Sequence, residues 1–350
     1  MQKNVIMTNK KLYFCVLINK LFIMKRVPFF LFIFCITILF VGCKKKSVSG
    51  FKVENFSNGK AGEIILVMDK EHISPDLTKQ VVQILQKPQP AINQVEPMFD
   101  ILKFNSSDFN SFYQKHRNIV HFDINADYAH NTISFNKDVW SSPQVYVHIK
   151  GNNTDSCYAL FVENEEKIIN LLYDNDLKRL QLHFFKNNDA SVELRIKEKF
   201  GIQMSVPQQY FIAREETDFI WLRFKTTKND RFILVYRTPV YELSKENLIK
   251  TRDLMTKMYI PGAVNGSYPK IAQHSGFPIY NPIQVKSKNG MELRGLWESV
   301  GDYMGGPFYS FTFVDAKGTY CVTIDGFVYA PEETKRDFLR EVEAIVKSVR

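Results

Sequence analysis

The apolar run at residues 27–42 limits which part of this chain can fold as a globular protein. It follows Lys25 and Arg26, contains 16 residues without a charge, and ends at Gly42. A basic start, an apolar core and a small residue before the cut are the parts of an export signal that is removed from the mature chain. The run is shorter than the roughly 18 residues expected of a membrane-spanning helix, so an uncleaved anchor is the second interpretation. We therefore predict that residues 1–42 are a signal peptide.

The cysteine that follows this run predicts lipidation. Gly42 and Cys43 come directly after the apolar core, which is the layout of a bacterial lipoprotein signal. We expect Cys43 to become the new N-terminus, to carry lipid such as palmitate, and to attach the protein to a membrane. Residues 1–23 add a second apolar patch and four lysines ahead of a complete signal that begins at Met24, and a start codon assigned too early would account for them.

The basic excess of the chain lies beside this signal. The formal net charge is +9, of which six positive charges precede Gly42 and Lys44, Lys45 and Lys46 supply the remaining three. From Ser47 onward, 37 basic residues balance 37 acidic ones. Nucleic-acid binding needs a basic face on the folded domain, so nothing in the charge supports a nucleic-acid partner. The three lysines either strengthen binding to an anionic membrane surface or form part of a solvated tether.

Cysteine and histidine spacing predicts neither a metal site nor a cofactor. The chain contains no CxxC pair and no Cys/His spacing of the zinc type. Beyond Cys43 only Cys157 and Cys321 remain, and each has apolar or aromatic neighbours. In an oxidising periplasm the two could form a disulfide. Two buried thiols are the interpretation that their surroundings favour.

Strand-like and helical patterns alternate along the mature chain. A polar tether at residues 43–59 precedes two halves, residues 60–200 and 201–350, and each half mixes both patterns. In the first half, strand patterns lie at residues 62–68, 98–104, 118–124, 132–136 and 144–150. Ser74 and Pro75 open a helix after the first of these strands, and residues 154–200 have a helical pattern. The second half has strands at residues 210–213, 219–224, 231–236, 291–300, 307–314 and 319–328, a helix after Ser244 and a final amphipathic helix. We expect an α+β protein with two lobes, in which mixed and antiparallel sheets pack against helices.

Catalytic motifs with a known mechanism are absent from the sequence, which lacks GxSxG, HExxH, the phosphate loop and the dinucleotide GxGxxG. Four histidines nevertheless fall in one region of strands and loops: His116, His121, His130 and His148. Side chains two apart on a strand share a face, so His121 and Asp123 could form an acid/base pair or contribute to a metal site. A solvated sheet face is the more usual meaning of such a pattern.

The densest unusual segment surrounds a Gly-rich turn at residues 301–306. Two strands joined there would bring Arg294, Trp297, Tyr303 and Met304 together, as a ligand or partner edge that offers a cation and aromatic faces. The alternative, which we favour, is a sheet core in which Trp297 is buried and glycine is needed for the tight turn.

Several segments resemble a Bacteroidota lipoprotein family that is catalogued as a domain of unknown function, number 4837. They include Arg294-Gly295-Leu296-Trp297, Met304-Gly305-Gly306-Pro307-Phe308 and Gly326-Phe327-Val328-Tyr329-Ala330-Pro331, together with residues 94–99, 117–119, 252–253, 259–262 and 335–336. The resemblance implies location in the cell envelope and no catalytic residue. In its order of elements the second half is also similar to the PsbP/Mog1-type α/β/α sandwich, and such a likeness implies no function.

These observations favour a non-catalytic binding or assembly module of the cell envelope, with an envelope protein as its partner. Surface lipoproteins of such bacteria carry acidic residues after the lipidated cysteine, and this chain has Lys44, Lys45 and Lys46 there. By that resemblance we expect the periplasmic face of the outer membrane. The alternatives are a periplasmic hydrolase of glycan or peptide that uses His121 and Asp123, and a small-ligand carrier that uses the edge from Arg294 to Phe308.

Overall fold

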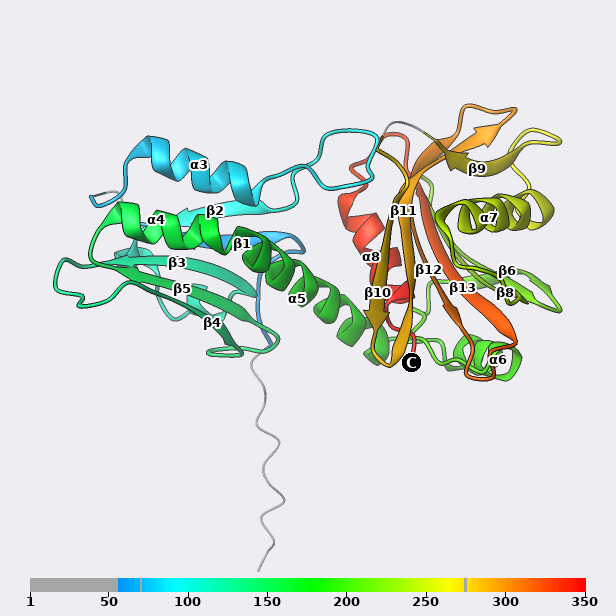
Figure 1. The fold of residues 1–350 in the computed structure, drawn as a ribbon, viewed down its shortest axis with the longest axis horizontal. Helices are drawn as coiled ribbons and strands as arrows, with labels where there is room; N and C mark the ends of the chain where they lie inside the picture. The colour runs from blue at the N-terminus through cyan, green and yellow to red at the C-terminus, as the bar shows by residue number, and fades with distance from the viewer. Residues whose placement is uncertain (1–55, 70, 274–275) are drawn as a thin grey trace, which may run out of the picture. The chain divides into compact units, whose positions relative to one another are not determined.

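The computed structural model describes residues 56–69, 71–273 and 276–350, which belong to one compact unit (Figure 1). The predicted signal peptide, the lipidation of Cys43 and the lysines that follow it lie outside the described residues. The predicted α+β class is confirmed, because two sheets are each packed against helices.

The first sheet is mixed and has the strand order β2-β1-β3-β5-β4. The pairs β1–β2, β1–β3 and β3–β5 are parallel, and β4 is antiparallel to β5. The strand bounds are β1 (Glu63–Val67), β2 (Asp100–Phe104), β3 (Asn118–Ile124), β4 (Thr132–Lys137) and β5 (Val145–Gly151). In β1, Ile64 and Leu66 face one cluster of buried side chains while Ile65 and Val67 face another. Burial on both faces explains why this strand is a continuous apolar run.

Helices follow the strands of this sheet. They are α3 (Pro75–Leu85), α4 (Thr154–Glu163), α5 (Glu165–Lys186) and α6 (Ala190–Phe200), with short 3-10 turns η1 (Ser106–Asp108) and η2 (Tyr113–Lys115) between β2 and β3. The start of α3 is as predicted, since the Ser74 hydroxyl accepts a hydrogen bond from the Leu77 amide and Pro75 occupies the first turn. The predicted helical region therefore consists of three helices, the last of which ends at Gly201 in the left-handed conformation.

The second sheet is antiparallel, with the order β10-β11-β12-β13-β8-β7-β6 and β9 paired to β11. Its strands are β6 (Phe211–Glu216), β7 (Phe219–Lys225), β8 (Asp230–Pro239), β9 (Tyr268–Ala272), β10 (Ile279–Val285), β11 (Lys288–Val300), β12 (Gly305–Val314) and β13 (Tyr320–Tyr329). The sequence patterns did not predict β9 and β10, which contain Pro269 and Pro282. Proline removes a backbone donor and is therefore confined to the margins of a sheet, where both strands lie.

Two helices cover opposite faces of the second sheet (Figure 1), α7 (Lys245–Tyr259) and α8 (Arg336–Val346). Side chains alternate along β12, so some face α8 and the others face α7. Tyr309 and Phe311 pack in the cluster that includes α8, and Phe308 packs in the cluster that includes Leu248 of α7.

Buried polar contacts join α5 to α8. Glu343 of α8 accepts a hydrogen bond from the Tyr173 hydroxyl of α5, and Arg340 of α8 pairs with Asp176 of α5 at 3.2 Å. Both carboxylates are fully buried. The two halves of the described chain therefore share a polar core as well as an apolar one.

Candidate functional site

The four residues of the predicted ligand edge do not come together. Arg294 and Trp297 lie three positions apart on β11, and side chains an odd number apart on a strand point to opposite faces. Arg294 lies on the α8 side, where its Nη2 is 2.7 Å from Glu343. Trp297 lies on the α7 side, is 3% exposed, and donates its indole N–H to the Val328 carbonyl at 3.0 Å. The grouping of Arg294 with Trp297 was therefore wrong.

The two predicted residues of the turn, Tyr303 and Met304, lie in different environments. Tyr303, between β11 and β12, is fully exposed. Met304 is partly buried and lines the same cavity as Trp297. Two of the four predicted residues, Trp297 and Met304, thus belong to one site, and that site is completed by residues from other strands.

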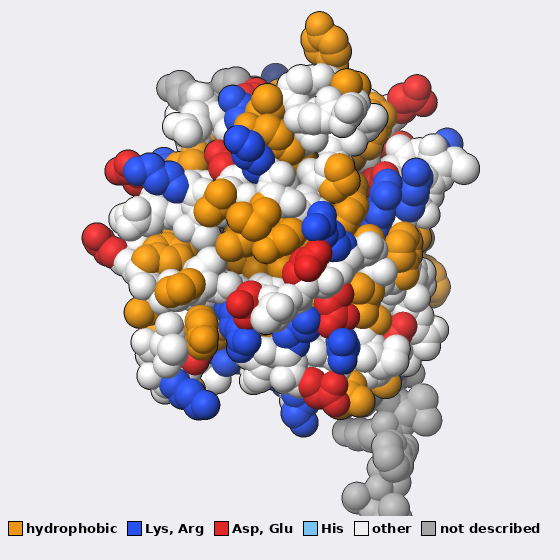
Figure 2. Space-filling view, turned by 90° about the vertical axis from the view of Figure 1, so that its right-hand side faces the viewer, with side chains coloured by type: hydrophobic (Ala, Val, Ile, Leu, Met, Phe, Trp, Pro, Cys, Tyr) orange, Lys and Arg blue, Asp and Glu red, His pale blue; other side chains and the backbone are white. Residues whose placement is uncertain are grey.

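This cavity, which we call the aromatic groove, has a volume of about 490 Å³. It lies on the α7 side of the second sheet, where the segment between α7 and β9 approaches the strands. Figure 2, which faces the side of the molecule carrying α7 and β9, shows hydrophobic side chains gathered in the middle and charged ones around them. The groove is lined by Trp221, Phe232, Trp297, Met304, Phe327 and Tyr329, by Arg223, Lys225, Asp230 and Ser299, and by Ile260, Pro261, Gly262, Ala263 and Pro269.

Strand register builds the aromatic wall. Phe232 of β8 and Phe327 of β13 are directly paired, and their rings stack with centroids 4.4 Å apart and planes 9° from parallel. Trp221 of β7 stacks on Phe232 at 5.9 Å, and Trp297 meets Phe327 edge-on at 5.5 Å. Cross-strand aromatic pairs of this kind add stability beyond their buried area. The wall is therefore built by contacts within the sheet itself.

Glycine at position 306 makes room for the Trp297 indole. A Cβ there would lie 2.1 Å from the Val328 carbonyl oxygen and 3.2 Å from Trp297 Nε1, which are the two atoms of the hydrogen bond. The predicted need for glycine at the turn has two causes. Gly301 adopts a φ of +77°, as the turn prediction required, and Gly306 provides space.

Polar groups surround one end of the groove. The Arg223 guanidinium donates two hydrogen bonds to Asp230, at 3.1 and 2.8 Å, and lies 5.8 Å from the centre of the Trp221 ring. Within the described part of the chain, the buried Trp221 Nε1–H and the buried Ser299 hydroxyl have no hydrogen-bond partner. Buried polar groups are nearly always paired, so these two atoms are available to water or to a ligand that supplies an acceptor.

A buried ion pair joins α7 to the second sheet next to the groove. Arg252 of α7 lies 2.8 Å from Asp325 of β13, and both side chains are almost completely buried. The Arg252 guanidinium stacks over the Phe308 ring at 4.2 Å. Burial raises the pKa of Asp325, although the charge of Arg252 opposes that shift. This pair fixes α7 against the sheet, since removing either partner would leave a charge in an apolar core.

The histidine region forms a different network from the predicted one. Asp123 accepts hydrogen bonds from the Tyr128 hydroxyl and from His148 Nε2, at 3.0 and 3.1 Å. His121 instead bonds to the Tyr146 hydroxyl at 3.0 Å. The predicted pairing of His121 with Asp123 was therefore wrong. The two share a face of β3, but the carboxylate bonds instead to His148 of β5, which the register places opposite His121.

The electrostatics of this network favour a neutral imidazole. Burial, together with the nearby His148, lowers the pKa of His121 to about 4. His116 is also buried, which lowers its pKa, and His130 is exposed. Within the described residues, no group of three or more His, Cys, Asp or Glu side chains could hold a metal ion. The aromatic groove contains none of these histidines.

Both described cysteines are free and buried. Cys157 lies near the start of α4, beside the first sheet, and Cys321 lies in β13 of the second sheet, so they occupy different layers of the fold. Burial raises the pKa of the Cys157 thiol to about 11 and also raises that of Cys321. The favoured interpretation of two buried thiols agrees with this arrangement.

Comparison with known proteins gives two family matches. Residues 189–348 match the model of a domain of unknown function, DUF4837, and residues 57–185 match another, DUF8532. The crystal structure of the Ran-binding protein Mog1p from Saccharomyces cerevisiae is similar to 43% of this chain, over 91% of its own length, with 10% identity and a TM-score of 0.30. A TM-score this low supports no conclusion about fold or function. No curated protein matches the chain. None of the described helices is long and apolar enough to cross a membrane.

Proposed function

Residues 189–348 of the chain belong to the DUF4837 family, and we propose from the aromatic groove that the protein is a non-catalytic binding module of the cell envelope. In this proposal a lipid on Cys43 holds it at the periplasmic face of the outer membrane. The groove receives an apolar segment of an envelope protein.

The observation that carries this proposal is the groove itself. Its aromatic wall, its Arg223 guanidinium and its 490 Å³ volume suit a few side chains of a partner. Trp, Tyr and Arg are the residues that dominate binding energy at protein interfaces, particularly in preformed, desolvated pockets. The unpaired Trp221 N–H can donate to a backbone carbonyl of the bound segment.

The charged groups of the groove favour binding over catalysis at this site. Among the described residues that line the groove, Asp230 is the only acidic one, and it is neutralised by two hydrogen bonds from Arg223. General acid–base catalysis needs a positioned group with a free proton or lone pair. A hydrolase that uses His121 and Asp123 has less support, because Asp123 is already bonded to His148 and Tyr128.

Location at the envelope is inferred from the sequence alone. The basic and apolar signal that ends at Cys43, and the lysines that follow it, are its support. Palmitate labelling of cells that express the chain tests this part. Label that is absent, or that persists in Cys43→Ala, would contradict the anchor.

Site-specific photocrosslinking tests the groove. A benzophenone amino acid at position 304 would lie in the lining, whereas at the neighbouring position 303 it would be fully exposed. We expect a discrete adduct with an envelope protein from position 304, a much weaker one from 303, and loss of the 304 adduct in Trp221→Ala. Equal adducts from both positions would contradict binding in the groove. A circular dichroism spectrum of each variant controls for folding.

A small-ligand carrier is the second candidate, because the groove volume lies within the range of about 300–1,000 Å³ that is usual for small-molecule sites. Native mass spectrometry of protein purified from the envelope tests it. A bound non-protein mass that is lost in Ala263→Trp, which narrows the groove, would favour the carrier over the protein-binding module.

A further inference from the structure

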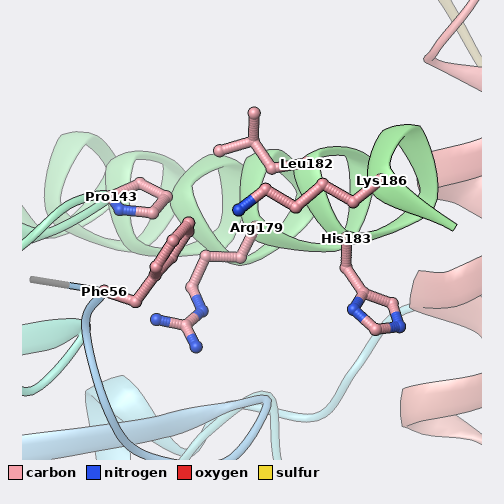
Figure 3. A pocket seen from close by; sticks show the side chains of 6 residues that line it. All are labelled: Phe56, Pro143, Arg179, Leu182, His183 and Lys186. Carbon is pink, nitrogen blue, oxygen red and sulfur yellow. The ribbon is translucent and has the colours of Figure 1, made fainter. Parts of the chain in front are cut away.

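A second cavity, of about 230 Å³, lies where the described chain begins (Figure 3). It is lined by Phe56, Pro143, Arg179, Leu182, His183 and Lys186. Four of these residues follow the spacing i, i+3, i+4 and i+7 along α5, so they occupy one face of that helix. None of them belongs to the aromatic groove.

The cavity is bordered by cations. Arg179 donates hydrogen bonds to the carbonyl and hydroxyl oxygens of Ser57, and the Lys186 ammonium lies 3.8 Å from the centre of the Phe56 ring. His183 follows Arg179 by one helical turn. Among the described residues that line the cavity, none is acidic. These groups together form a site that suits an anion.

The nearest acidic residue on the helix is already engaged. Asp176, one turn before Arg179, pairs with Arg117 and Arg340, each at 3.2 Å. Burial, and to a smaller degree the charge of Arg117, lowers the pKa of Arg179 to about 10. The guanidinium therefore keeps its charge at neutral pH in a place where an external anion would stabilise it.

Large apolar side chains are exposed at Phe56 and along the same turns of α5. Phe56 is 57% exposed, Phe185 is 58% exposed and Leu182 is 39% exposed. Exposed Phe and Leu next to Lys and Arg are typical of helices that lie in a membrane interface, because the rings enter the headgroup region while the cations meet the phosphates.

The chain length places this surface near the anchor. Phe56 follows Cys43 by 13 residues, and even a fully extended chain of that length spans at most about 47 Å. Lys44, Lys45 and Lys46 lie within that segment. A lipid on Cys43 would therefore keep the cavity within reach of the bilayer that holds it.

We propose that Phe56, Arg179, Leu182, His183, Phe185 and Lys186, which we call the basic α5 surface, dock on an anionic bilayer and that the cavity receives a lipid phosphate headgroup. This inference rests on the lipid anchor of the proposed function and adds to it a defined orientation on the membrane. Removal of one cation should weaken docking about fivefold, since a Lys or Arg near an anionic membrane surface contributes about that factor in affinity.

An environment-sensitive fluorophore tests the surface on the mature lipoprotein. The label is attached to Phe185→Cys and, as a matched control, to Leu194→Cys of α6, whose side chain is 54% exposed. Cys157 and Cys321 are buried, so the introduced cysteine is the accessible thiol. The protein is reconstituted in vesicles of phosphatidylethanolamine with phosphatidylglycerol, or of phosphatidylcholine alone.

We expect a blue shift at position 185 in the phosphatidylglycerol vesicles that position 194 does not show. The shift should be lost in Lys186→Glu, retained in Lys197→Glu, and lost at about 1 M salt, where charges are screened within about 3 Å. Equal spectra in both kinds of vesicle, or an unchanged shift in Lys186→Glu, would overturn the proposal. A shift produced in detergent by inorganic phosphate alone would also overturn it, in favour of a free-anion site.

The lipid anchor is tested separately from the docking surface. The intact mass of the purified protein shows whether Cys43 carries lipid. An unmodified Cys43 would contradict the anchor of the proposed function, whereas a lipidated protein without the spectral shift would contradict only the basic α5 surface.

Discussion

Replacing Glu343 with glutamine should destabilise the protein severely, because this carboxylate neutralises a buried cation. Glu343 is fully buried on α8, and Arg294 of β11 lies 2.7 Å from it with only 10% of its side chain exposed. Lys347 also pairs with Glu343 but keeps 25% of its side chain exposed, so it can return to water. The loss is therefore dominated by Arg294, and a buried charge left without its partner costs about 3–5 kcal/mol.

The acid dependence of stability gives a second measure of the same interaction. Burial alone would raise the pKa of Glu343, but Arg294 and Lys347 together hold it at about 2, below its ordinary value of 4.5. A folded pKa below the unfolded one means that the stabilisation is complete above pH 4.5 and is lost as the pH falls toward 2. At 1.36 kcal/mol per pH unit this amounts to about 3 kcal/mol.

Urea unfolding, followed by circular dichroism at several pH values, measures both quantities. Glu332→Gln is the matched control, since Glu332 is exposed. Glu343→Leu combined with Arg294→Leu should recover most of the loss, because removing both members of a buried pair is often nearly neutral. A loss below about 1 kcal/mol in Glu343→Gln, or a double variant no better than the single one, would refute the reasoning.

Three further outcomes are expected. The folded pKa of His121, about 4, lies below its ordinary 6.5, so the free energy of unfolding should fall as the pH drops from 6.5 toward 4. Urea unfolding at pH 7 and pH 5 measures this difference, and His121→Gln should reduce it. Gly306→Ala should lower the free energy of unfolding by about 1–3 kcal/mol and change the tryptophan fluorescence, since the new Cβ would lie 2.1 Å from the Val328 carbonyl oxygen. An unchanged melting temperature and emission spectrum would show that the backbone can shift to accommodate the Cβ. Cys157 and Cys321 should react with a water-soluble thiol reagent only after unfolding, and reaction of either in the native protein would contradict their burial.

Local patterns predicted most of the elements because they depend on neighbouring residues. The Ser74 cap and Pro75 predicted the start of α3, and the apolar run at residues 62–68 predicted β1. Strands β9 and β10 escaped prediction, since their prolines argue against a strand until the sheet margin is known. Strand alternation, applied to the odd spacing of Arg294 and Trp297, would have separated them from the sequence alone.

The sequence by itself determined the α+β class and the balance of charge after Ser47, because each depends on composition or on neighbours along the chain. It also predicts the export signal that ends at Cys43. Tertiary structure alone decided which side chains form sites. Trp221 and Trp297 meet around one groove only because β7, β8, β13, β12 and β11 are adjacent in the sheet, and Asp123 meets His148 only because β3 and β5 are adjacent. Strand order arises from contacts between residues far apart in sequence, and local patterns constrain register only through side-chain alternation and turn geometry.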